Sequence, residues 1–159
     1  MIQKIERHVE PFQICSNGRD ALKLAGLSFF VSLLLLMIAC VCGGIFPFGK
    51  TAMLREDAIY QYVGFFGWFS RVLKGEANLF YSFSKGLGGS TIGLYAYYLA
   101  SPLNLMMGFF KPEDAPKVMT IIIIVKLCLM ASSMTWFLKR RFNACGYSCI
   151  LAGVSYGLA

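Results

Sequence analysis

The sequence predicts an all-α, polytopic membrane protein with interfacial helices in its first outer loop. Of its 159 residues, 57% are hydrophobic and only 14% are charged, whereas soluble domains are close to half apolar and a quarter charged. The apolar residues are concentrated in long runs without charge, and a basic cluster follows one of these runs. Such runs are typical of transmembrane helices, and basic clusters are typical of their cytoplasmic ends.

The first run, residues 24–48, predicts transmembrane helix 1. It contains 25 residues without a charge, and a helix of about 20 apolar residues crosses a bilayer core. The apolar region of a signal peptide spans only about 7–15 residues. We therefore expect a signal anchor that stays in the protein, preceded by an N-terminal arm at residues 1–23.

Two later runs predict further spans. Residues 118–138 are apolar except for Lys126 and predict transmembrane helix 2. Another run occupies residues 147–159 and predicts the start of transmembrane helix 3. Its 13 residues reach about 20 Å as a helix, less than a bilayer core of about 30 Å. We expect the native protein to continue beyond Ala159.

The distribution of basic residues predicts the topology. Arg19 and Lys23 precede the first span, and a basic cluster, 139–141, follows the second. By the positive-inside rule the arm and residues 139–146 are cytoplasmic, and residues 49–117 form the first extracytoplasmic loop. This loop has about 70 residues, beyond the roughly 60 over which loop charge decides topology. The net charge of +7 is thus assigned to membrane orientation and not to nucleic-acid binding.

Residues 86–110 leave an alternative to this topology, because they also form a run of 25 residues without a charge. If they spanned the bilayer, the cluster at 139–141 would lie outside. Their interior contains several glycines, Ser101-Pro102, Asn104 and a tyrosine cluster, and tyrosine favours the membrane–water interface. We expect this segment to lie on or dip into the outer leaflet.

An aromatic-rich helix is predicted near the start of the outer loop. Apolar residues recur at close to helical spacing from Ile59 to Leu73, and Gly75 can end the helix. This pattern favours an interfacial helix. Asp57 precedes or begins its first turn, where an acid is favoured by the helix dipole.

The glycine-rich segment that follows could bind phosphate. Lys85 is followed by Gly86, Gly88 and Gly89, but neither the P-loop nor the dinucleotide fingerprint fits. Two interpretations remain: an ordinary glycine turn, or a backbone nest for phosphate with Lys85 as counter-charge.

Lys126 lies inside the second predicted span, where a lysine costs about 2.5–3.5 kcal/mol. It is either a counter-charge for an anionic headgroup or a snorkelling, structurally paired lysine.

No metal or disulfide framework is predicted. The six cysteines include no CxxC pair and none lies in residues 43–127, so we interpret them as packing residues. Glu113 and Asp114 are a possible metal pair, but an N-cap cluster for the second span is favoured. His8, the only histidine, is given no catalytic role.

The outer loop resembles the YfhO family of bacterial membrane proteins. The resemblance is carried by residues 80–90 (FYSFSKGLGGS) and 93–105 (GLYAYYLASPLNL), and by residues 57–62 (DAIYQY), which match an Asp-x-x-x-Gln-Tyr element of that family. It covers residues from about 25 to the end of the chain.

The resemblance implies a GT-C-like fold and a glycosyltransferase activity. Such enzymes have many spans and transfer a sugar from a polyprenyl phosphate donor on the outer face of the membrane. For this family the acceptor is a cell-envelope polymer such as a teichoic acid. The chain would be the N-terminal part of such an enzyme in the bacterial plasma membrane, inactive on its own.

The resemblance also implies roles for residues. Asp57 matches the catalytic acid of the first outer loop, with Glu56 as the alternative acid. Lys85, the three glycines after it and Lys126 are expected to bind the phosphate of the donor, together with Gln61 and Tyr62 of the matching element. The need for a divalent metal stays open.

Direct displacement with inversion is expected, because no second carboxylate is evident at the roughly 5 Å that retention requires. Two other functions are consistent with the same residues: a non-enzymatic transporter or flippase for the lipid-linked sugar, and a scaffold subunit for a separate glycosyltransferase.

Overall fold

The computed structural model describes residues 18–142 and 145–159, and 74% of the chain is helical. The helical fold class is therefore confirmed. The predicted N-terminal arm at residues 1–23 lies mostly outside the described residues, as does His8. The described chain forms two compact units, one made of residues up to Leu35 and from Lys126 onward, the other of Leu36–Val125. The boundary between them falls within helices α1 and α4.

Two helices of the described chain are long and apolar enough to cross a membrane. They are Gly18–Gly43, with 26 residues, and Pro112–Phe142, with 31 residues; the second comprises a short 3₁₀ turn, η4 (Pro112–Asp114), and helix α4 (Ala115–Phe142). Only 28% of the apolar window is buried in either. Most of the apolar surface of each helix is therefore not covered by protein, as is typical of a helix surrounded by lipid.

Helix α1 (Gly18–Gly43) begins and ends earlier than the predicted range of 24–48. Its end is a Schellman motif: Ile45 N donates to Cys40 O at 2.9 Å, and Gly44 N donates to Val41 O at 3.3 Å. Gly44 has φ +60°, the left-handed conformation that this motif requires. The glycine therefore ends the helix although the apolar run continues to Phe48.

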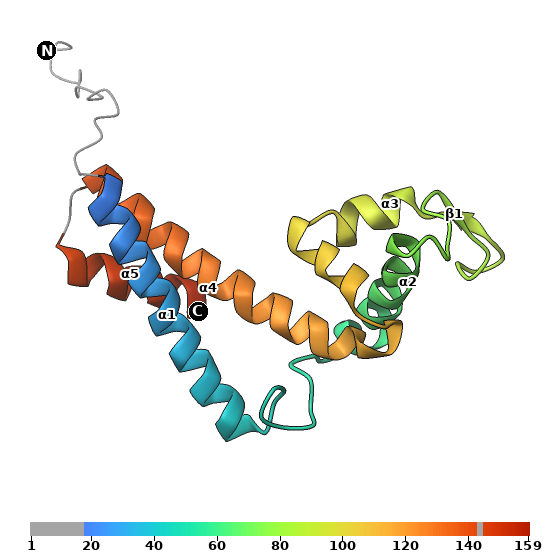
Figure 1. Cartoon of the computed structure of the whole chain (residues 1–159), viewed down its shortest axis with the longest axis horizontal. Helices are drawn as coiled ribbons and strands as arrows, with labels where there is room; N and C mark the ends of the chain where they lie inside the picture. Colours follow the sequence, from blue (N-terminus) through green and yellow to red (C-terminus); the bar gives the residue numbers. More distant parts are fainter. Residues whose placement is uncertain (1–17, 143–144) are drawn as a thin grey trace, which may run out of the picture. The chain divides into compact units, whose positions relative to one another are not determined.

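In the first unit, α1, α4 and α5 (Gly146–Leu158) lie side by side (Figure 1). Gly153 faces α4 so closely that an added Cβ would lie 2.7 Å from the Ala131 carbonyl oxygen. The Thr135 hydroxyl lies 2.9 Å from Ser28 Oγ and 3.3 Å from Cys149 O, all buried. Small residues that allow close backbone approach and hydroxyls that bond across helices are typical of membrane helix packing.

The second unit is built on a π-helical turn, η1 (Ala58–Tyr62), that continues into helix α2 (Val63–Leu73). The helix predicted from the aromatic spacing is thus present. It also ends as predicted, at Gly75, which has φ +77° and lies in a second Schellman motif in which Glu76 N donates to Arg71 O at 2.9 Å. Its position at a membrane interface stays a prediction.

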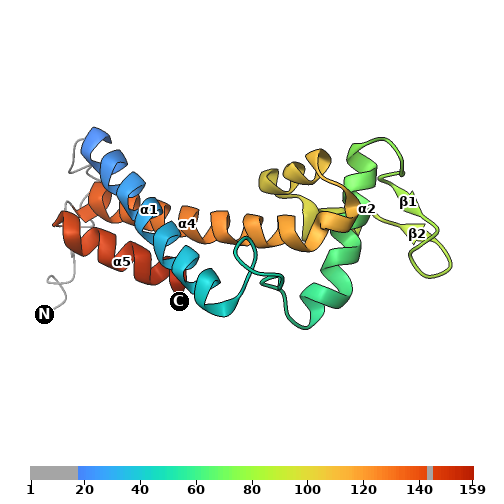
Figure 2. The same ribbon diagram turned by 60° about the horizontal axis from the view of Figure 1, so that its bottom comes forward.

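A two-stranded antiparallel hairpin follows, and the all-α expectation did not include it. Strands β1 (Tyr81–Ser82) and β2 (Gly89–Ser90) pair with Tyr81 opposite Ser90 (Figure 2). Gly88 N donates to Lys85 O at 3.0 Å, and Gly86 and Gly88 have φ of +62° and +108°. Hairpin turns require such positive φ values, which glycine adopts without a Cβ penalty.

Residues 86–110 contain no helix long enough to cross a bilayer. After β2 the chain forms α3 (Ile92–Leu94), a π turn η2 (Tyr95–Leu99) and a 3₁₀ helix η3 (Pro102–Phe109), which at 8 residues is the longest. Irregular backbone is not viable across lipid because its polar groups need partners. This finding favours the predicted topology over the alternative with a span here.

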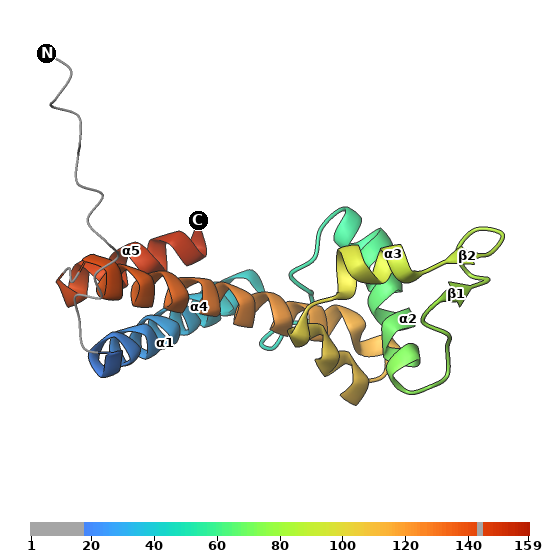
Figure 3. The ribbon, with the colours of Figure 1, turned by 90° about the horizontal axis from the view of Figure 1, so that it is seen from above.

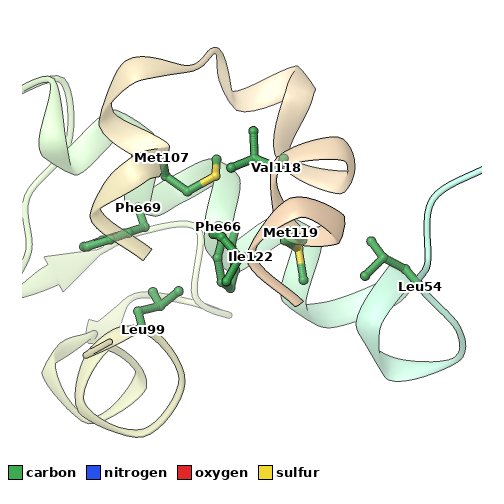
Figure 4. Close-up of a cluster of buried hydrophobic side chains, with 9 residues drawn as sticks. Leu54, Phe66, Phe69, Leu99, Met107, Val118, Met119 and Ile122 are labelled. Carbon is green, nitrogen blue, oxygen red and sulfur yellow. The ribbon is translucent and has the colours of Figure 1, made fainter. Parts of the chain in front are cut away.

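An apolar cluster joins these pieces to the start of α4 (Figure 4). Its buried members are Leu54, Phe66, Phe69, Leu99, Met107, Ala115, Val118, Met119 and Ile122. Burying each large apolar side chain contributes about 1.5–3 kcal/mol. Polar groups at its edge are bonded: Ser70 Oγ donates to Phe110 O at 2.9 Å, and Asn104 Nδ2 donates to Leu99 O at 3.1 Å. The cluster fixes one face of α2 and leaves the opposite face for the cavity described below.

Candidate functional site

A cavity of about 360 Å³ lies in the second unit, between the η1–α2 helix and the hairpin. The helix contributes one face at helical spacing: Tyr60, Gln61, Gly64, Phe65, Trp68 and Arg71. Between these positions lie Phe66, Phe69 and Ser70, which are buried on the core side. The core therefore determines which face of α2 lines the cavity.

The second wall of the cavity comes from the hairpin and the residues after it: Ser82, Ser84, Lys85, Thr91 and Leu94. Thr91 is buried, and its N–H donates to Phe80 O at 3.1 Å, which closes the base of the hairpin. Lys85 Nζ donates to Ser90 O at 2.7 Å across the hairpin. This bond holds the ammonium group at the cavity.

The cavity combines positive charge with an aromatic wall. Arg71 and Lys85 are its charged lining residues, and no carboxylate lines it. Tyr60, Phe65 and Trp68 form the apolar side. Two cations and nearby hydroxyls suit an anionic group such as a phosphate, and aromatic faces suit the apolar face of a ring. At about 360 Å³ the cavity is near the lower end of ligand sites, about 300–1,000 Å³. It therefore fits a small headgroup and not a long chain.

Among the predicted site residues, the structure brings Gln61 and Lys85 together at the cavity. Tyr62 does not line it. Its ring instead packs on Tyr98, with the ring centroids 5.0 Å apart, and it contacts the apolar cluster. Substrate binding by Tyr62 stays a prediction.

Asp57 lies about one helical turn before Gln61, at the N-cap of η1. Its side chain is exposed and makes no capping hydrogen bond. Asp57 does not line the cavity but precedes the first lining residue, Tyr60, by three positions. The carboxylate is accessible from solvent and is not occupied in a structural bond.

Glu56, the alternative acid, has φ +48°, which is rare for a residue with a Cβ. Its carbonyl accepts the N–H groups of Ile59 and Tyr60, at 2.9 and 3.3 Å. A left-handed residue other than glycine costs about 1–3 kcal/mol. Glu56 therefore begins the helix in a strained conformation immediately before Asp57.

Of the predicted glycines, Gly86 and Gly88 lie in the turn of the hairpin and Gly89 begins strand β2, and none of the three lines the cavity. Because the Gly88 N–H is donated to Lys85 O, it is not free for a phosphate nest. A Cβ at Gly88 would also clash with the Tyr81 side chain. The glycine turn is thus present, and phosphate binding by Gly86, Gly88 and Gly89 stays a prediction.

Lys126 belongs to the first unit and is half-buried on α4. Within residues 18–142 and 145–159, its side chain makes no hydrogen bond or ion pair. Its predicted role as a counter-charge is untested by this structure.

One of the two acids near the second span, Asp114, forms an ion pair at the start of α4. Asp114 Oδ1 accepts a bond from Lys117 Nζ at 3.1 Å at the start of α4. In the part of the chain that is described, no three His, Cys, Asp or Glu side chains are grouped so as to hold a metal, and the five cysteines there are free thiols.

Arg71 and Trp68 are site residues that the sequence analysis did not select. Both lie in the aromatic-rich helix predicted from Ile59 to Leu73, but neither stands in the motifs that indicated a site. The available signal was their spacing from Gln61: Trp68 at +7 residues and Arg71 at +10 residues lie on the same helical face as Gln61. This spacing shows which residues share a helical face, but it identifies the face that lines a site only when the face that packs on the apolar cluster is known.

Comparison with known proteins adds one finding. A family model described as "Bacterial membrane protein YfhO" matches residues 28–159. Neither the curated proteins nor the solved structures gave a match. The matched residues are most of the chain and include the larger part of α1, all of α4 and the whole cavity.

Proposed function

The chain belongs to the YfhO family of bacterial membrane proteins, and from that premise we propose that it works in a membrane glycosyltransferase with a GT-C-like fold. The donor is a sugar on polyprenyl phosphate, and the acceptor is a cell-envelope polymer of the teichoic-acid type. The observation that supports this proposal is the cavity whose first lining residue, Tyr60, follows Asp57 by three positions, and which combines Arg71 and Lys85 with aromatic side chains.

The proposed location is the bacterial plasma membrane, with α1 and α4 as spans and residues 49–117 outside. In this orientation the cavity, which is formed by residues 60–94, lies on the outer side of the membrane, and the N-terminal arm and the residues that follow α4 are cytoplasmic. The basic residues Lys139, Arg140 and Arg141 in the last turn of α4 support the orientation.

Asp57 is proposed as the general base. It takes the proton of an acceptor hydroxyl as that oxygen attacks the anomeric carbon, and the bond from that carbon to the phosphate oxygen breaks with its electron pair leaving on the phosphate. The exposed, unbonded carboxylate supports this role.

The departing phosphate gains negative charge, which fixed cations stabilise. Lys85, already held by Ser90 O, and Arg71 are the proposed partners. Gln61 is proposed to orient the sugar, and Lys126 stays a further candidate for the phosphate. The proposed outcome is inversion, since no lining residue of the cavity is a carboxylate that could act as nucleophile. A product with retained anomeric configuration would rule out this step.

The test of the enzyme uses two neighbouring substitutions in the protein reconstituted with donor lipid and acceptor. Asp57→Asn is expected to lower kcat by about 10²–10⁴-fold, the usual contribution of a general base, without loss of expression. Glu56→Gly, which accommodates the positive φ, is expected to retain activity. The reverse pattern would move the catalytic role to Glu56.

One observation favours a second function. The cavity has two cations and no carboxylate, which is sufficient to bind a headgroup without chemistry. A flippase for the lipid-linked sugar would need this binding and not Asp57, and a scaffold for a separate glycosyltransferase would show no turnover of its own. Transport or transfer that survives Asp57→Asn at the parent rate would favour these alternatives.

A further inference from the structure

We infer that the β1–β2 hairpin binds lipid. Its outward face lies in the outer surface of the bilayer, and its inward face closes the cavity. The occupant of the outward face is bilayer lipid. The inference goes beyond the proposed function, because it holds whether or not the chain transfers sugar.

The hairpin has two chemically different faces. Ser82 and Ser84 point into the cavity. Tyr81 and Phe83 alternate with them and are exposed, with their ring centroids 5.1 Å apart. Of these four residues, Tyr81 and Ser82 lie in the strand, where successive residues point to opposite sides. Neither Tyr81 nor Phe83 lines the cavity, so the polar side chains gather at the cavity and the aromatic side chains gather outside it.

The outward face is apolar and uncovered. The exposed fraction of the side chain is 80% at Phe83 and 103% at Leu87, and Phe80 and Tyr81 are also exposed. None of the residues between Phe80 and Ser90 belongs to the apolar cluster of the unit. The hairpin extends away from the helices of its unit (Figure 3). A contiguous apolar surface of this kind marks an interaction site.

The charge of the surrounding chain favours lipid as the occupant. From Ala77 to Pro112 the chain contains no acid and two bases, Lys85 and Lys111. Lys85 lies in the turn itself, between Phe83 and Leu87. Its ammonium group is held at the cavity, and the exposed aromatic and aliphatic side chains beside it have no acid nearby to repel phosphate. Such a tip suits a surface that presents phosphate groups above acyl chains. Tyrosine, here Tyr81, is also enriched at this depth of the membrane.

The hydrogen bonding of the hairpin limits how deeply it can enter the bilayer. The turn is closed by Gly88 N to Lys85 O at 3.0 Å and Ser84 N to Ser82 Oγ at 3.2 Å. A two-stranded hairpin nevertheless has open edges, whose polar groups are not tolerated in the hydrocarbon core. The tip is therefore placed at the boundary of headgroups and acyl chains, about 5–10 Å deep. At that depth the cavity opens at the level of lipid headgroups.

Tryptophan fluorescence tests the inference directly. The chain has two tryptophans, which we would replace as Trp68→Phe and Trp136→Phe. Into this background, Leu87→Trp places a single probe on the outward face, and Ser84→Trp places a matched probe on the cavity face of the same hairpin. Each protein is reconstituted in nanodiscs of phosphatidylcholine and phosphatidylglycerol, with either ordinary lipids or lipids brominated near the top of the acyl chain.

The expected result is loss of Leu87→Trp fluorescence with brominated lipid and a blue-shifted emission, with neither effect for Ser84→Trp. If acrylamide in the water phase quenches Leu87→Trp and brominated lipid does not, the tip lies in water and the inference is wrong. If neither quencher reaches it, protein covers the tip, and the inference is also wrong. Equal quenching of both probes by brominated lipid would contradict the two-faced arrangement. Transferase activity is assayed in the protein that keeps both native tryptophans, because Trp68 lines the cavity. Absence of activity there, together with the expected signal from Leu87→Trp, would leave this inference intact and remove only the proposed function.

Discussion

Arg71 and Lys74 lie one helical turn apart at the end of α2, and their surroundings differ. Arg71 lines the cavity. Lys74 Nζ instead donates to Phe110 O at 2.7 Å, outside the cavity. The two cations therefore form a natural pair for asking whether positive charge is needed at the cavity or merely near it.

We predict that Arg71→Gln lowers kcat/KM for the donor by about tenfold to a hundredfold, because a hydrogen bond to a charged group contributes about 1.5–3 kcal/mol. Lys74→Gln is the matched control and is expected to change kcat/KM little. Steady-state kinetics with purified donor lipid measure both. Equal losses of kcat/KM in the two variants would show that the anion does not bind preferentially at the cavity.

Some site residues were predictable one by one and others were not. Gln61 and Lys85, which line the cavity, could be selected because they stand in short motifs whose chemistry is visible along the chain. The role of Asp57, selected in the same way, stays a proposal. Arg71 was not selected, because its position depends on the hairpin returning to cover one face of α2. The strain at Glu56 was also not predictable, since the sequence there contains no glycine to indicate a positive φ.

At the scale of elements, the hairpin depends on glycine at one position and not at its neighbour. Gly88 has φ +108°, and a Cβ there would clash with Tyr81. A Cβ at Gly89 would meet only Lys85 Cδ, at 3.8 Å, an ordinary contact. The turn therefore requires glycine at position 88 but not at position 89.

Gly88→Ala is expected to open the hairpin, because a left-handed residue with a Cβ costs about 1–2 kcal/mol. The population of the open form should rise about 5–30-fold. The rate of tryptic cleavage after Lys85 measures this opening. Gly89→Ala should be cleaved at the parent rate, and similar acceleration in both variants would contradict the account of the turn.

The packing of α5 on α4 gives a second prediction for an element. Gly153→Ala would place a Cβ 2.7 Å from the Ala131 carbonyl oxygen and against Thr135. Overpacking of this kind costs about 1–3 kcal/mol, so the free energy of unfolding in detergent should fall by that amount. Gly26→Ala on α1, where no atom lies within 4 Å, is the control and should not lower it. Equal stability of the two variants would show that α5 does not pack as described.

Helices were predictable as elements, but their ends and the hairpin were less so. The charge-free runs indicated α1 and α4. The end of α1 was placed too late, because a Schellman motif at Gly44 overrides the continuing apolar run. Helix α4 extends to Phe142, past the predicted 138, because basic residues suit a helix C-terminus. Strands of two residues carry no alternation pattern long enough to detect, so β1 and β2 were read only as a glycine turn.

At the scale of the whole molecule, the proposed activity depends on the side of the membrane that the cavity faces. The basic residues at the end of α4 predict that this end is cytoplasmic. If α4 crosses the bilayer once, its beginning and the unit that contains Asp57 lie outside. The absence of a long helix between residues 86 and 110 supports a single crossing between Asp57 and that basic end.

The most direct measurement is the reaction of an impermeant maleimide with a thiol at position 57. The six native cysteines are first replaced by alanine, and Asp57→Cys is introduced. Phe142→Cys, exposed at the end of α4, serves as the cytoplasmic control. The account predicts that intact cells label position 57 and not position 142, which reacts only after lysis. Labelling of position 57 only in broken cells would place the cavity in the cytoplasm and contradict the account.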